Sequence, residues 1–122
     1  METVKFLNIG NNNMKTHKYI CHKQEWSSHT NWFIMESHGY AMLRMTLYRT
    51  NPGTAWVSDL FVTENQREKG YASGLLDYAI AIANEEHFNM ECMVSKQSKL
   101  LLRIKGFKEL KNGNFAREFE RK

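Results

Sequence analysis

A glycine-containing loop near the middle of the chain separates a strand-like segment from a helix-like segment. The loop covers residues 67–72, with the sequence Arg-Glu-Lys-Gly-Tyr-Ala. Residues 55–62 before it are rich in β-branched and aromatic side chains, which predicts a strand. In residues 71–83 after it, apolar side chains recur at three- and four-residue spacing, which predicts a half-buried helix. Helical N–H groups and the helix dipole would face the loop, so the sequence predicts an anion-binding site there.

Two common phosphate-binding loops do not fit this segment. The nucleotide-triphosphate loop ends in Gly-Lys-Ser/Thr, whereas Lys69 precedes Gly70 here. The dinucleotide fingerprint needs a third glycine at the position that Leu75 occupies. The loop therefore predicts a phosphate site of another kind, in which Gly70 lets the backbone approach the ligand closely.

The loop and its surroundings resemble the Gcn5-related N-acetyltransferase (GNAT) family. That family carries Arg/Gln-x-x-Gly-x-Gly/Ala after a strand that ends in an apolar-aromatic-Val triplet. Here the triplet is Leu60-Phe61-Val62, and the signature is Arg67-x-x-Gly70-x-Ala72. The later elements also follow the family order, with a strand at 88–94, a helix at 95–105 that ends in Gly106-Phe107, and a hairpin around Asn112-Gly113.

The resemblance implies a single domain over residues 1–122 with an α/β (α+β) fold: a mixed, mostly antiparallel central sheet with helices packed on it. The N-terminal half predicts strands at 15–22, 31–37 and 40–49, and a further strand or ordered arm at 4–9. The family usually places one or two helices between its first two strands, as a wall of the acceptor site. Only residues 23–30 remain for them, so we expect a reduced N-terminal helical region. The acceptor pocket would then be open, completed by another subunit, or shaped for a large substrate.

The resemblance also implies an N-acetyltransferase that passes the acetyl group of acetyl-CoA to a primary amine by direct attack in a ternary complex. The backbone of the strand end would bind the pantetheine arm, the loop would bind the pyrophosphate, and Ser95 would replace the asparagine that opens the second helix in the family. The expected cofactor-binding residues are Leu60, Phe61, Val62, Arg67, Glu68, Lys69, Gly70, Tyr71, Ala72, Ser73 and Ser95.

The acid and base of the reaction are less evident. The family often carries a tyrosine four residues before the Gly-Phe pair, and Leu102 stands there. A weak or inactive relative that binds coenzyme A or a protein partner is therefore the alternative. Two carboxylates are candidate bases, Asp59 and Glu91. On strict alternation Asp59 shares a face with Val57 and Phe61, so its side chain either makes a structural hydrogen bond or faces the acceptor amine.

Composition limits the remaining possibilities. The net charge is +4, but the basic residues are scattered without interleaved aromatics, so nucleic acid is not an expected partner. The five histidines have no metal-site spacing. The absence of a membrane-length apolar run and of a signal peptide, with only two cysteines, favours a cytoplasmic protein. We expect a small-molecule amine or a protein lysine as acceptor, and the edge strand of the final hairpin would suit a homodimer.

Overall fold

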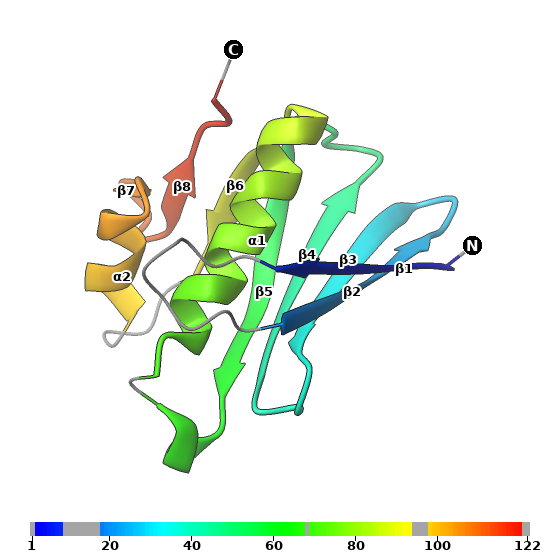
Figure 1. Cartoon of the computed structure of the whole chain (residues 1–122). Coiled ribbons are helices and arrows are strands. Elements are labelled where there is room, and N and C mark those ends of the chain that lie inside the picture. The colour runs from blue at the N-terminus through cyan, green and yellow to red at the C-terminus, as the bar shows by residue number, and fades with distance from the viewer. Residues whose placement is uncertain (1, 9–17, 68, 94–97, 121–122) are drawn as a thin grey trace.

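The computed structural model describes residues 2–8, 18–67, 69–93 and 98–120 (Figure 1). In this part of the chain eight strands form one sheet in the order β1-β2-β3-β4-β5-β6-β8-β7. Only the β5–β6 pair is parallel, so the expected mixed, mostly antiparallel sheet is confirmed. The elements are β1 (Glu2–Asn8), β2 (Lys18–Glu25), β3 (His29–Glu36), β4 (Ala41–Tyr48), β5 (Thr54–Val62), η1 (Glu64–Gln66), α1 (Tyr71–Glu86), β6 (Asn89–Cys92), α2 (Lys99–Ile104), β7 (Lys108–Glu109) and β8 (Phe115–Arg117).

Helix α1 covers one face of the sheet and contacts β3, β4, β5 and β6 (Figure 1). Its apolar residues repeat with the period of a helix, and the strands alternate with a period of two, so both present one apolar side to the same core. That core includes Tyr19, Cys21, Trp32, Ile34, Leu43, Met45, Leu75, Leu76, Ala79 and Ala83. No helix in the described part of the chain is long and apolar enough to cross a membrane.

The N-terminal strands form hairpins. Residues 23–30, which we expected to be the only place left for the N-terminal helices of the family, form no helix. These residues are the end of β2, a tight connection and the start of β3, closed by the Trp26 N–H, which donates to the His29 carbonyl at 2.8 Å. No room for a helix exists there because cross-strand pairing takes up the segment. Residues 2–8 are strand β1, so the strand alternative is confirmed. The connection between the first two strands is residues 9–17, which lie outside the described part.

Strand β5 contains a β-bulge at Ser58. Met45 of β4 pairs with Val57, but the next residue, Arg44, pairs with Asp59, which leaves Ser58 as the extra residue. Val57 is buried before the bulge, whereas Leu60 packs against the core after it. The bulge therefore changes which side chains of β5 face the core: odd-numbered residues face it before Ser58, and even-numbered residues face it afterwards. Asp59 shares a face with Phe61, as expected, but the expectation that it also shares a face with Val57 is wrong, because strict alternation does not pass through a bulge.

A buried carboxylate fixes the β3–β4 hairpin beside the start of α1. Glu36 accepts hydrogen bonds from the His38 N–H at 2.8 Å, from His38 Nδ1 at 2.6 Å and from the Tyr40 N–H at 3.2 Å. Burial alone raises the pKa of Glu36, but these hydrogen bonds outweigh it and hold the pKa below its ordinary value. The Tyr40 ring lies 6.1 Å from the ring of Tyr71, the first residue of α1. The hairpin is thus held against the helix start.

The last third of the chain follows the predicted order in its described part, with β6 at Asn89–Cys92 and α2 at Lys99–Ile104. Gly106, at φ 90°, follows α2, and Phe107 is buried. The final hairpin turns at Gly113, which has φ 88°. Its loop is one residue longer than an Asn-Gly turn, because the Leu110 N–H donates to the Asn114 carbonyl at 2.7 Å.

Candidate active site

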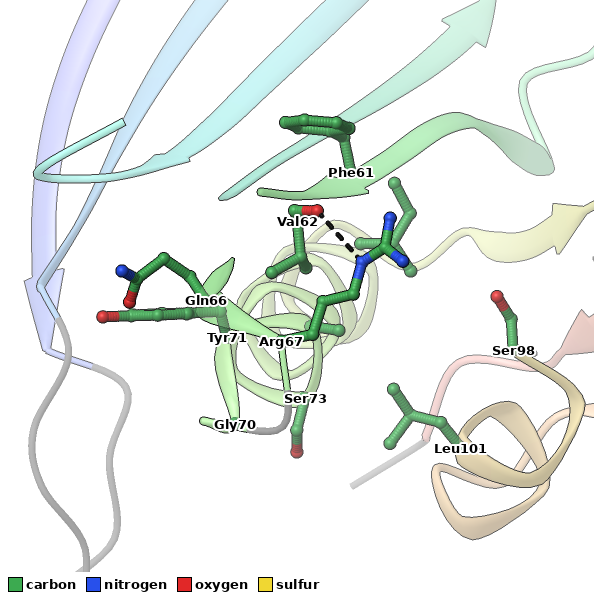
Figure 2. Close-up of a pocket in the computed structure, with 11 residues that line it drawn as sticks. Phe61, Val62, Gln66, Arg67, Gly70, Tyr71, Ser73, Ser98 and Leu101 are labelled. Atoms are coloured by element: carbon green, nitrogen blue, oxygen red, sulfur yellow. Dashed lines mark hydrogen bonds between the residues drawn. The ribbon is translucent and has the colours of Figure 1, made fainter. Parts of the chain in front are cut away.

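A cleft of about 460 Å³ opens where the C-terminal end of β5, the start of α1 and α2 meet (Figure 2). Three separate parts of the sequence contribute to it, and the fold brings them together. The lining residues are Leu60, Phe61, Val62, Gln66, Arg67, Gly70, Tyr71, Ala72, Ser73, Ser98 and Leu101.

One wall of the cleft is a strand edge that no described strand pairs with. Strand β6 pairs with β5 only between Thr54 and Val57, so residues 58–62 have β4 on one side only. The Thr63 N–H donates to the Tyr40 carbonyl at 2.7 Å, which sets the alternation of the β4–β5 ladder. In an antiparallel ladder alternate residues turn their N–H and C=O groups to the partner strand. The backbone groups of Leu60 and Val62 therefore point away from β4, toward the cleft.

The opposite wall is the first turn of α1. Gly70 precedes the helix with φ 87°, a left-handed conformation that suits glycine. The Gly74 N–H donates to the Gly70 carbonyl at 3.0 Å and starts the helical ladder. The N–H groups of the earlier helical residues, such as Ala72 and Ser73, have no intrahelical acceptor and are directed at the cleft. This arrangement favours an anion.

Cationic side chains stand beside the helix start. Arg67 Nε donates to the Val62 carbonyl at 3.5 Å, which draws the guanidinium over the cleft between the strand end and the helix (Figure 2). Lys69 Nζ donates to Gln66 Oε1 at 3.0 Å. The positive charge of Arg67 and Lys69 therefore lies where the helix dipole also favours an anion.

Most of the expected cofactor-binding residues line this one cleft. Glu68 and Ser95 lie outside the described residues, and Lys69 is near the cleft through its bond to Gln66. Sequence reasoning missed Gln66, Ser98 and Leu101. Ser98 stands immediately before α2 with helical backbone angles and without a side-chain capping bond, so no capping signal marked it.

The two candidate bases lie in different places. Asp59 is half-exposed, forms an ion pair with Arg44 Nη2 at 3.0 Å, and lines a small cavity next to Leu60 of the cleft. Glu91 accepts a hydrogen bond from Asn114 Nδ2 at 3.0 Å and lines a separate cavity with Lys108 and Arg117. Leu102, at the position of the usual tyrosine, is buried. The structure thus brings Asp59, and not Glu91, to the end of the cleft.

The comparisons with known proteins agree with this geometry. The family model described as "Acetyltransferase (GNAT) family" matches residues 6–104. The chain belongs to the GNAT acetyltransferase family, whose members depend on acetyl-CoA. A search of curated proteins finds no match.

Several solved structures share the fold. Gcn5 of Tetrahymena is 14% identical with a TM-score of 0.60, over 78% of this chain and 71% of that chain. An acetyltransferase of Bacillus cereus is 20% identical with a TM-score of 0.59, over 75% of this chain and 73% of that one. N-acetylglutamate synthase of Neisseria gonorrhoeae, solved with coenzyme A and L-arginine, is 12% identical with a TM-score of 0.61, over 75% of this chain and 25% of that chain.

Proposed function

We propose that this protein transfers the acetyl group of acetyl-CoA to a primary amine while both substrates are bound. One observation carries the proposal: a single cleft holds a strand edge that pairs with no strand in the described part of the chain, facing a helix start that is preceded by a left-handed glycine. A pantetheine arm has amide groups that can pair with such an edge. A pyrophosphate has the charge that such a helix start binds. The cleft therefore fits both chemical parts of coenzyme A.

The binding roles follow from the directions of the backbone groups. Leu60 and Val62 would hold the pantetheine amides, and the first turn of α1 would hold the pyrophosphate, assisted by Arg67. Phe61, whose backbone is directed at β4, also borders the cleft, but its exposed side chain lies on the opposite side of the strand from Val62 (Figure 2). Contributions of Glu68 and Ser95 stay predictions.

The transfer itself needs little from side chains because the thioester is already activated. The amine nitrogen attacks the carbonyl carbon, a C–N bond forms, and the C–S bond breaks. The proton lost by nitrogen passes to Asp59 directly or through one water, and the sulfur leaves as a thiolate. A thiol pKa of about 8.5 allows this departure without an acid, so Leu102 at the usual tyrosine position is compatible with turnover. The Leu60 N–H would stabilise the charge that develops on the carbonyl oxygen.

The acceptor would approach from the face of the sheet opposite α1, where Asp59 lies. Across this face Ile20, Met35, Met42 and Phe61 occupy paired positions on four neighbouring strands and form an apolar row. The Arg44–Asp59 ion pair lies in the next row. A primary amine attached to an apolar body, on a small molecule or on a protein lysine, suits this surface.

Changing Asp59 to Asn is expected to reduce kcat by about 100-fold, because it removes the proton acceptor and keeps the shape. The dissociation constant for acetyl-CoA should stay within about twofold. Thiol release is measured with the amines that the wild type turns over, from a panel of polyamines, aminoglycosides and lysine peptides. Glu91→Gln is the matched control, because it makes the same change on β6 in the separate cavity. Equal loss of kcat in both variants, or in Glu91→Gln alone, would refute Asp59 as the base.

Changing Arg67 to Ala is expected to raise the dissociation constant for coenzyme A by about tenfold, because a hydrogen bond to a charged group is worth about 1.5 kcal/mol or more. The effect should shrink at high salt. Calorimetric titration at two salt concentrations measures the loss of affinity and its dependence on salt. Arg49→Ala is the control, since Arg49 is exposed and does not line the cleft. An unchanged affinity in Arg67→Ala would exclude this arginine from phosphate binding.

A further inference from the structure

An ion pair stands on the face of the sheet opposite α1, beside the proposed reaction centre. Arg44 Nη2 lies 3.0 Å from Asp59 Oδ2, and the two residues pair directly across β4 and β5. Both side chains remain about half-exposed, at 41% for Arg44 and 50% for Asp59. An acceptor whose amine reaches Asp59 therefore also comes close to the guanidinium of Arg44.

These two residues are isolated charges on their part of the sheet. Alternate residues of β3, β4 and β5 share this face, and the bulge at Ser58 brings Asp59 level with Arg44. The other residues of these three strands on the same face carry no formal charge at pH 7: His29, Asn31, Phe33, Met35, Met42, Thr46, Tyr48, Thr54, Trp56 and Phe61. A ligand that lies here meets one cation and one anion, side by side, on an otherwise neutral surface.

The guanidinium of Arg44 has an unused donor. Its Nε is buried and makes no hydrogen bond with any described residue. A guanidinium presents a planar fork of N–H groups that matches the two oxygens of one carboxylate. Asp59 contacts Nη2 and leaves Nε without a partner. Because a buried donor without a partner is unfavourable, a carboxylate that engages both nitrogens in place of Asp59 would bind this arginine better than Asp59 does.

An acceptor that carries both charges can exchange partners with this pair. Its carboxylate takes the place of Asp59 at Arg44, and its ammonium pairs with the released Asp59. In an α-amino acid the amine and the carboxylate are attached to the same carbon atom, which suits charged groups that stand as close as these two. A second ammonium group on the acceptor would instead be repelled by Arg44. The pair therefore favours an amino carboxylate over a polyamine.

Apolar side chains border the ion pair. Phe33 of β3 pairs with Arg44, and Met42 is the preceding residue of β4 on the same face. Phe61 pairs with Met42, is 54% exposed, and points to the side of β5 away from Val62 (Figure 2). An aliphatic side chain on the acceptor would bury its surface against this border.

We infer that Arg44 determines which acceptor is used, and that the acceptor is a free amino acid with an apolar side chain, whose carboxylate binds Arg44 while its amine faces Asp59. The inference rests on the proposed function and specifies its acceptor. The transfer step keeps its balance: nitrogen bonds to the thioester carbonyl carbon and gives its proton to Asp59, the C–S bond breaks, and the sulfur leaves as a thiolate.

The first test compares two acceptors that differ in the carboxylate alone, leucine and leucinamide. Thiol release from acetyl-CoA should show a kcat/KM about tenfold higher for leucine, mainly through KM, because hydrogen bonds to a charged group are lost in the amide. The amine of leucinamide is the less basic of the two, so a lower rate with the amide does not come from a larger protonated fraction. Lysine peptides in the same assay represent the competing acceptor class.

The second test changes the arginine. Arg44→Gln should raise the KM for leucine about tenfold, to the value for leucinamide, and leave the dissociation constant for acetyl-CoA unchanged. A merely structural role of Arg44 would instead lower turnover of both acceptors by the same factor. Arg49→Gln makes the same change at an exposed arginine just after β4 and should keep the wild-type ratio.

A third readout needs no turnover. With free coenzyme A present, the NMR signal of the Arg44 Nε–H group should shift on titration with leucine and stay in place with leucinamide.

The outcomes separate this inference from the proposed function. Equal kcat/KM for leucine and leucinamide, or turnover of lysine peptides without turnover of leucine, overturns the role of Arg44 and leaves the proposed function standing. A leucine preference that persists in a folded Arg44→Gln variant also overturns it. Absence of acetyl-CoA binding at millimolar concentration contradicts the proposed function, and the inference falls with it. If Arg44→Gln does not fold, the wild-type ratio and the Nε–H signal decide.

Discussion

Replacement of Gly70 by glutamate is expected to weaken acetyl-CoA binding by more than about 100-fold, which is about 2.7 kcal/mol. Two causes act together. Gly70 has φ 87°, a conformation that costs another residue about 1–2 kcal/mol. The new carboxylate would also stand at the helix start where the phosphates bind, and like charges repel. Calorimetric titration with acetyl-CoA measures the loss.

A glycine of the same backbone conformation provides the control. Gly113 has φ 88°, and a Cβ added to it would meet nothing within 4 Å. Gly113→Glu therefore introduces the same backbone cost and the same charge in the final hairpin, away from the cleft. Its melting temperature should fall while its affinity for acetyl-CoA stays near that of the wild type. Wild-type affinity in Gly70→Glu would contradict the phosphate site.

Replacement of Gly74 by alanine is expected to destabilise the fold by about 2 kcal/mol. The direction is unusual, because alanine in a helix interior normally stabilises by up to about 1 kcal/mol relative to glycine. Here the added Cβ would overlap the Tyr19 hydroxyl and would lie 2.6 Å from Tyr19 Cζ. Tyr19 is fully buried between α1 and the sheet and packs edge-on against Tyr78, so it has no space to retreat. Denaturant unfolding measures the change.

Two further variants identify the cause. Gly53→Ala should be nearly neutral, because its Cβ would meet nothing within 4 Å. Combining Gly74→Ala with Tyr19→Phe should recover part of the lost stability, since the nearest atom is gone and the two sites are in contact. A Gly74→Ala protein as stable as the wild type would show that α1 does not pack this closely on β2.

The glycine loop before α1 and helix α1 itself could be predicted because their signals are local. A left-handed glycine, cationic neighbours and a helical apolar stripe all lie within residues 67–83. The order of elements after α1 was also visible, since Gly106 and Gly113 mark chain reversals that need positive φ. These features depend on the backbone preferences of single residues and on short-range periodicity.

Other parts of the site depend on pairing between distant segments. The bulge at Ser58 is defined by the register between β4 and β5, so alternation along β5 alone misplaced Asp59. The separation of Glu91 from the cleft follows from its position on β6, where Asn114 of the final hairpin binds it. The N-terminal hairpin at Trp26 lacks glycine and proline, so no strong turn signal marked it.

The most direct measurement is an amide NMR titration of the wild-type protein with acetyl-CoA. We expect saturable shifts concentrated at Leu60, Val62 and residues 70–73, where the backbone groups face the cleft. Much smaller shifts should occur at Glu91 and Arg117, which line the separate cavity. Absence of shifts at millimolar acetyl-CoA, or shifts centred on Glu91 and Arg117, would contradict the assignment of the cleft as the coenzyme A site.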